Sequence, residues 1–320
     1  MSPRLIRHLG ILAGFAALLL VMIGLGLAFG SEPVSLLAPT ASEQAILWQI
    51  RLPRVLLGAA VGACLASAGA GLQSLLRNPL AEPYLLGVSN GAALGTMAAL
   101  FFAGAIGFLQ PVLAFVGAVF SIATVYALAR GKVGVSVERL VLAGVIVTTF
   151  LSSVIILLTS LLDATRLRSF TFWLLGDLSQ AGFTSFWMAA GAACVGTLLL
   201  VWKAGALNLM MIGERDAFDF GVDVRATRIT VLLAAAGMVG ASVAAGGSVG
   251  FVGLIVPHIV RLAFGSDNRG VLPYSALGGA AFVVFADLVA RTAIAPRELP
   301  VGAVTAIFGC PLFIALLRRG

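Results

Sequence analysis

Few residues in this chain could do chemistry, and most of them lie outside its apolar segments. The 320 residues include 13 Asp and Glu, 2 His and 3 Cys. There is no G-x-x-x-x-G-K-[ST] phosphate loop, no H-E-x-x-H and no C-x-x-C. His258 follows a proline inside an apolar run, where a hydrogen-bonded histidine is commoner than a metal ligand. We therefore expect no catalytic residue and no metal site.

Ionisable residues are almost absent from the long apolar segments. Asp287 is the exception, and it lies one turn before Arg291, with which we expect it to pair. Carriers driven by protons or sodium usually bury such groups within their helices. The chain is thus predicted to lack its own energy source. A secondary transporter or channel working alone remains the alternative, and an integral membrane enzyme a third.

The composition is that of a polytopic membrane protein. Hydrophobic residues make up 60% of the chain and charged residues 10%, against roughly 25% charged in soluble domains. No window suits a separate soluble domain, so we expect one transmembrane domain, 1–320. The three cysteines lie in apolar segments and offer no disulfide framework. The apolar run 9–30 exceeds a signal peptide's core and is interpreted as a retained first helix.

Ten apolar segments could position these residues. They are 9–30, 55–76, 85–107, 111–129, 140–162, 183–202, 229–246, 251–264, 270–286 and 299–317. If every segment crosses, both termini lie on one side, and the basic residues divide into fourteen on that face and six on the other. The positive-inside rule then predicts cytoplasmic N- and C-termini. The net charge of +7 is an orientation signal, and nothing indicates nucleic-acid binding.

One apolar stretch, GSVGFVGLIVPHIVRLAFGSDNR at 247–269, is interrupted by several glycines and Pro257. Glycine is flexible and proline lacks an amide hydrogen, so one unbroken helix is disfavoured. We predict a helix ending near Ala245, a tight turn, and a short helix at 251–264. Such a break at membrane depth favours a transport pathway. A plain hairpin between two spanning helices is the alternative.

Two loops on the predicted inner face could carry function. The loop 203–228 is long enough for two short helices, broken at Gly213 and Gly221, and its Phe218 and Phe220 need something to bury them. It is either a docking surface or a loop folded under its own bundle. In 73–91, two prolines block a continuous helix, and Glu82 is expected to satisfy a helix N-terminus or to pair with Arg77.

On the predicted outer face, Arg51 and Arg54 begin a helix and Arg291 follows another. The guanidinium fork suits carboxylate partners. Arginines near an interface more often anchor the helix by extending to the headgroups, so both roles stay open.

Four stretches together resemble the FecCD family of permeases from binding-protein-dependent ABC importers for ferric siderophores, haem and cobalamin. They are RLPRVLLGAAVGACLASAGAGLQSLLRNPLAEPYLLGVSNGA (51–92), GERDAFDFGV (213–222), residues 247–269, and ADLVARTAIAPRELPVGAVTAIFGCPLFIALL (286–317). The resemblance implies an all-α, type II ABC importer fold with ten transmembrane helices per subunit. It also implies a homodimer in the bacterial inner membrane, two cytoplasmic ATPase subunits and a periplasmic binding protein.

The resemblance also implies roles for particular residues. It places contacts to the ATPase subunit on Gly213, Glu214, Ala217, Phe218, Phe220 and Gly221. Contacts to acidic residues of the binding protein would fall on Arg51, Arg54 and Arg291. The inner gate of the translocation path would fall on Asn78, Leu80, Ser136 and Val137, where Val137 replaces an expected hydroxyl residue. No cofactor is expected in this chain, since ATP and Mg²⁺ would bind the partner ATPase.

Overall fold

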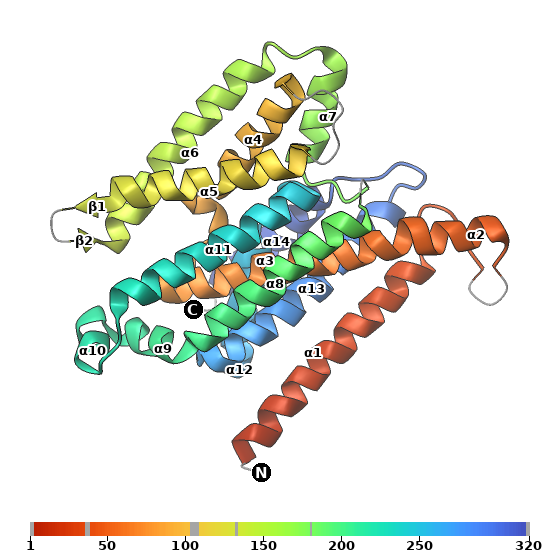
Figure 1. Ribbon diagram of the computed structural model, residues 1–320. Coiled ribbons are helices and arrows are strands. Elements are labelled where there is room, and N and C mark those ends of the chain that lie inside the picture. The colour runs from red at the N-terminus through yellow and green to blue at the C-terminus, as the bar shows by residue number, and fades with distance from the viewer. Residues whose placement is uncertain (1–2, 36–38, 103–108, 132–133, 180, 318–320) are drawn as a thin grey trace.

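The computed structural model describes residues 3–35, 39–102, 109–131, 134–179 and 181–317, and nearly every element in it is a helix (Figure 1). The longer helices are α1 (Pro3–Ala28), α3 (Leu52–Leu75), α4 (Val88–Phe102), α5 (Leu109–Ala129), α6 (Val137–Thr159), α8 (Phe183–Trp202), α11 (Val224–Gly246), α12 (Val252–Phe264), α13 (Asn268–Thr292) and α14 (Val301–Leu317). The shorter elements are α2 (Ala41–Ala45), η1 (Ile46–Arg51), η2 (Pro83–Leu86), α7 (Ala164–Leu174), α9 (Ala204–Ile212) and α10 (Glu214–Asp219).

Each of the ten predicted apolar segments overlaps one of the longer helices, although several of these helices begin or end a few residues outside the predicted bounds. Seven of the described helical segments are long and apolar enough to cross a membrane, and α4, α12 and α14 are shorter apolar helices. The predicted break is confirmed, since α11 ends at Gly246 and α12 begins at Val252. The all-α prediction missed one small element, an antiparallel hairpin of β1 (Arg130–Gly131) and β2 (Gly134–Val135).

Helix α3 runs through the centre of the molecule and packs against α8, α11, α12 and α13. Its small residues make this possible. A Cβ on Gly62 would lie 2.1 Å from the Gly279 carbonyl oxygen, and one on Gly69 would lie 1.9 Å from that of Gly253. Because lipid gives helices no hydrophobic reason to associate, close backbone packing of this kind holds the bundle together.

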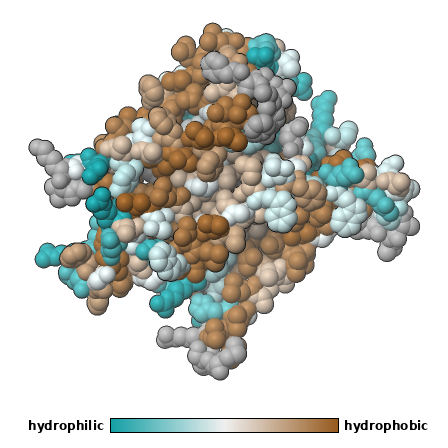
Figure 2. Space-filling view, in the orientation of Figure 1, coloured by the Kyte–Doolittle hydropathy of each residue, from teal (hydrophilic) through white to brown (hydrophobic). Residues whose placement is uncertain are grey.

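Polar residues gather at two opposite ends of the bundle, with a hydrophobic surface between them (Figure 2). One end, here named the α10 end, holds α9, α10, the hairpin and the junction of α12 with α13. Contacts tie it together, for example Asn208 Nδ2 to Asp267 Oδ1 at 2.7 Å. The other, named the arginine end, holds α2, η1 and the last turns of α1 and α13. This arrangement is that of a multi-pass membrane protein.

Candidate functional site

The predicted docking loop folds as two short helices, α9 and α10, separated by Gly213. Ala217 is fully buried, while Phe218 and Phe220 are 71% and 74% exposed. Gly221 ends the turn with φ of +81°, a conformation that glycine adopts without strain. The loop is therefore anchored by its alanine and presents two aromatic rings outward. Adjacent exposed rings at a polar end are typical of a protein-binding surface.

Glu214, the first residue of α10, is held by Arg228 of α11. Arg228 Nη2 donates to Glu214 Oε1, and Nη1 donates to the carbonyl of Val135 in β2. The Arg228 side chain is 8% exposed and the Glu214 side chain 36% exposed. One guanidinium thus connects the docking loop to the hairpin that precedes α6.

The predicted gate residues also lie toward the α10 end. Asn78 forms a tight turn in which its Oδ1 accepts from the amide of Leu80 at 2.8 Å, and Leu80 is 43% exposed. Ser136 caps α6 by accepting from the amide of Arg139 at 3.3 Å, and Val137 is the first residue of that helix. The charge of Arg77, which adjoins Asn78, acts on the carboxylate of Glu138, which adjoins Val137.

Between α11 and α12 the chain turns back inside the bundle. Phe251, at φ of +68°, precedes α12, and its amide donates to Glu82 Oε1 at 2.8 Å. Tyr84 Oη donates to the Val249 carbonyl and accepts from its amide, both at 3.0 Å. Glu82 therefore caps a helix N-terminus, one of its two predicted roles. These contacts supply the backbone partners that an irregular turn requires away from water.

Pro257 removes a backbone donor from α12, and Gln73 of α3 replaces it. Residue 257 would normally donate to the carbonyl of Gly253, but proline has no N–H. Gln73 Nε2 instead donates to the carbonyls of Gly253 and Leu254 at 3.4 and 3.1 Å. Gln73 is 3% exposed. The broken helix is thus specifically supported by the central helix.

Two G-x-S-x-G sequences meet at this turn, one at 246–250 within the turn itself and one at 87–91, at the start of α4. In some hydrolases that spacing presents a nucleophilic serine on a sharp turn. Here the two serines face each other, and Ser89 Oγ donates to Ser248 Oγ at 3.1 Å. The glycines instead permit close packing, since a Cβ on Gly91 would lie 2.3 Å from the Gly117 carbonyl oxygen. We assign these serines to the contact between α4 and the turn that joins α11 to α12.

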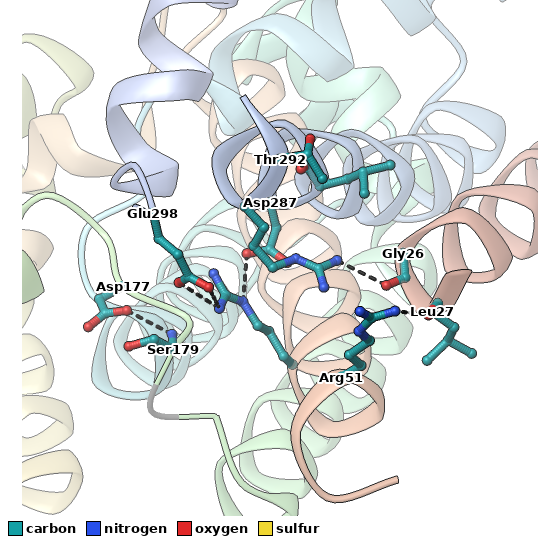
Figure 3. A network of polar contacts seen from close by, with 11 residues as sticks. Gly26, Leu27, Arg51, Asp177, Ser179, Asp287, Thr292 and Glu298 are labelled. Carbon is teal, nitrogen blue, oxygen red and sulfur yellow. Dashed lines mark hydrogen bonds and ion pairs between the residues drawn. The ribbon is translucent and has the colours of Figure 1, made fainter. Parts of the chain in front are cut away.

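The three predicted outer arginines are buried within the chain. Arg54 Nε donates to Asp287 Oδ1 at 2.9 Å, and its Nη1 lies 2.8 Å from Glu298 Oε2. Figure 3 shows Asp287 and Glu298 pointing toward the same guanidinium. Arg291 Nε lies 3.0 Å from Asp287 Oδ2, as predicted, in a charge contact without hydrogen-bond alignment.

Arg51 and Arg291 also satisfy the last carbonyls of α1. Arg51 Nη1 donates to Leu27 and Ala28 at 2.8 and 3.1 Å (Figure 3). Arg291 Nη2 donates to Gly26 at 3.0 Å. The final carbonyls of a helix lack internal partners, and cations there also favour the helix dipole. The arginines therefore join helices rather than extend to the interface, and contact with a binding protein stays a prediction.

Other candidate ligands do not assemble into a metal site. Within the described ranges, no three His, Cys, Asp or Glu side chains are grouped closely enough to hold a metal ion. The ring of His258 packs edge-on against Phe313, with centroids 6.1 Å apart. Cys64 is buried, whereas Cys194 and Cys310 are exposed, and all three are free thiols.

Sequence reasoning missed Arg228, Gln73 and Glu298. Arg228 ends the predicted loop 203–228, and nothing near it in the sequence indicates its partners, which come from two other elements. A lone glutamine in the apolar segment 55–76 was a usable signal for Gln73, since a polar side chain in lipid or core needs a partner.

Comparison with known proteins agrees with this arrangement. The model of the FecCD transport family matches residues 12–319. The hemin transport system permease protein HmuU of Yersinia pestis is 38% identical, over 97% of this chain and 96% of its own length. The vitamin B12 import system permease protein BtuC of Vibrio cholerae is 41% identical, over 87% of this chain and 84% of its own length.

A solved structure gives the same result for the fold. An inward-facing conformation of a metal-chelate type ABC transporter has a TM-score of 0.90 and 30% identity, over 97% of this chain and 99% of the other. Long apolar helices, a broken helix supported by the central helix, and an exposed aromatic loop accompany these likenesses. The chain belongs to the FecCD transport family.

Proposed function

We propose that this chain is the membrane-spanning permease of an ABC importer and that a separate ATPase subunit docks on α10. The observation that carries this proposal is the exposure of Phe218 and Phe220, about three quarters each, on a loop anchored by the buried Ala217. An aromatic pair with so much surface in water favours a protein partner. ATP and Mg²⁺ would bind that partner.

The assembly that we propose is a homodimer in the inner membrane, with a cargo path between two copies of ten spanning helices each. Two ATPase subunits would sit at the α10 end, which would face the cytoplasm, as would both termini. A periplasmic binding protein would dock at the arginine end. There, Glu298 is about one third exposed while Asp287 is almost fully buried. The Arg54–Glu298 pair is thus the part of the network that an acidic partner can reach.

The proposed cargo is an iron chelate, haem or a ferric siderophore, or cobalamin. The named relatives support this class, because one is a hemin permease and another a vitamin B12 permease. Their similarity to this chain is nearly equal, so it does not choose between the two.

Reconstitution into liposomes tests the proposed function. The chain would be combined with its ATPase and binding protein, and uptake of hemin, a ferric siderophore and cyanocobalamin would be measured. We expect ATP-dependent uptake of one of these cargoes and none when the ATPase is omitted. Uptake at the full rate without the ATPase would instead identify a transporter or channel that works alone.

A further inference from the structure

A cleft of about 960 Å³ lies at the α10 end, between the hairpin, α10 and the start of α11. Its lining includes Arg130 and Val135 from the hairpin, Glu214 and Phe218 from α10, and Arg225 and Arg228 from α11. Since a cleft of this size separates the hairpin from α10 on one side, movement of α10 needs a specific contact to reach the hairpin.

Arg228 provides that contact. Its two terminal nitrogens donate in different directions, one to the Val135 carbonyl and one to Glu214. The guanidinium is planar and rigid, so its two acceptors are held at a fixed separation. Arg228 is 7% exposed, which leaves it little freedom to exchange these partners for water.

Each partner of Arg228 belongs to an element with a proposed role. Glu214 begins α10, which carries the exposed Phe218. Val135 immediately precedes Ser136, which caps α6. A hydrogen-bonded chain therefore runs from the docking loop through one side chain to the first turn of α6. Coupling between distant sites travels through contiguous contacts of this kind.

A contribution to stability alone is a poor explanation for a buried arginine at position 228. Burying a charged side chain costs solvation, and a well-packed apolar side chain often serves stability as well or better. Arg228 Nε also has no hydrogen-bond partner, which adds to that cost. A buried ion pair is better explained where it fixes the relative positions of two elements.

We propose that Arg228 is a positioning residue that transmits ATPase-driven movement of α10 to the first turn of α6. This inference rests on the proposed function, because it requires an ATPase docked on α10. Without the Arg228 side chain, α10 would still move with the ATPase, but the predicted gate segment at Ser136 would no longer follow that movement.

A thiol reporter on α6 tests the proposal without knowledge of the cargo. Cys194 and Cys310 are exchanged for serine, while the buried Cys64 is kept, and Glu138→Cys places a reporter on the exposed first turn of α6. The labelling rate is measured in the complex with the ATPase, before and after trapping with ATP and vanadate. We expect trapping to change this rate about threefold or more, as for typical coupled sites.

Arg228→Gln is expected to abolish most of this change while the ATPase still co-purifies. Arg228→Lys keeps the charge but lacks the two-directional fork, so it should give an intermediate response. The matched control is Arg225→Gln, an exposed arginine one turn earlier that lines the same cleft and should respond like the parent.

Several outcomes would overturn the inference. They are a parental response in Arg228→Gln, a parent complex whose reporter ignores ATP, and loss of the ATPase from Arg228→Gln. If both Arg228 variants fail to fold while Arg225→Gln folds, Arg228 is a structural residue and the inference is wrong. A parent that binds no ATPase at all would contradict the proposed function instead.

Discussion

Gln73 and Pro257 show how one side chain can complete a backbone in another helix. Pro257 leaves the carbonyl of Gly253 without its usual helical donor. Gln73 approaches that carbonyl and the next one from α3, within 3.4 and 3.1 Å. Because the site is buried, an unpaired carbonyl there would cost about 1–3 kcal/mol. The pair therefore permits a proline in α12 without loss of the helix.

We predict that Gln73→Leu lowers the free energy of unfolding by about 1–3 kcal/mol in the native background. In a Pro257→Ala background the loss should be smaller, because residue 257 would then donate to the Gly253 carbonyl itself. Thermal unfolding in detergent is measured for the wild type, Gln73→Leu, Pro257→Ala and the double variant. The comparison gives the coupling between residues 73 and 257. Equal losses in both backgrounds would show that Gln73 does not substitute for the missing amide.

The two carboxylates that contact Arg54 differ in burial, and this predicts different sensitivities. Asp287 is 1% exposed and also contacts Arg291, whereas Glu298 is 33% exposed. Asp287→Asn would leave the buried Arg291 without a countercharge and Arg54 with Glu298 alone. Breaking a buried ion pair in this way lowers the free energy of unfolding by about 3–5 kcal/mol.

Glu298→Gln should lower the free energy of unfolding by less than about 1 kcal/mol, because the Glu298 carboxylate is partly exposed and solvent can take its place beside Arg54. Chemical unfolding of the two variants provides the comparison. Similar losses from both would mean that burial does not set the strength of this network.

At the scale of elements, the central helix α3 depends on residues that have no side chain. Its Gly69 packs so closely on α12 that an added Cβ would meet the Gly253 carbonyl oxygen at 1.9 Å. The neighbouring atoms are backbone, so they cannot move aside by changing a rotamer. Close approach here also brings Gln73 within reach of the carbonyls of α12.

Gly69→Ala should therefore destabilise the protein by about 1–3 kcal/mol, the usual cost of overpacking a well-packed core. The control is Gly237→Ala in α11, where an added Cβ meets nothing within 4 Å. Alanine favours helix over glycine, so the control should be neutral or slightly stabilising. A control as unstable as Gly69→Ala would argue against the packing explanation.

At the scale of the whole molecule, elements were easier to predict than the contacts between them. The break between α11 and α12 followed from Gly246, Gly247 and Pro257, since local backbone chemistry decides where a helix ends. The split of the docking loop followed in the same way from Gly213 and Gly221. Such signals lie within a few residues of the features that they determine.

Contacts between distant segments left weaker signals. Nothing local relates Arg228 to Val135, or Arg54 to Glu298, because the folded chain creates each pair. For the same reason, the sequence placed the three outer arginines at an interface, whereas packing against α1 and α13 buries them. Resemblance to a family suggested roles for these residues without indicating their partners.

The proposed permease takes its energy from a separate ATPase subunit bound to the loop around α10. Co-purification of the ATPase with tagged wild-type and Phe220→Asp proteins tests this most directly, with Phe29→Asp at the arginine end as the control. Both phenylalanines are more than half exposed on the surface of the protein, so neither change disturbs its packed core. We predict that Phe220→Asp reduces the bound ATPase about tenfold or more, as expected for an interface hot spot, while Phe29→Asp leaves it unchanged. Equal recovery of the ATPase with Phe220→Asp and wild type would contradict the account.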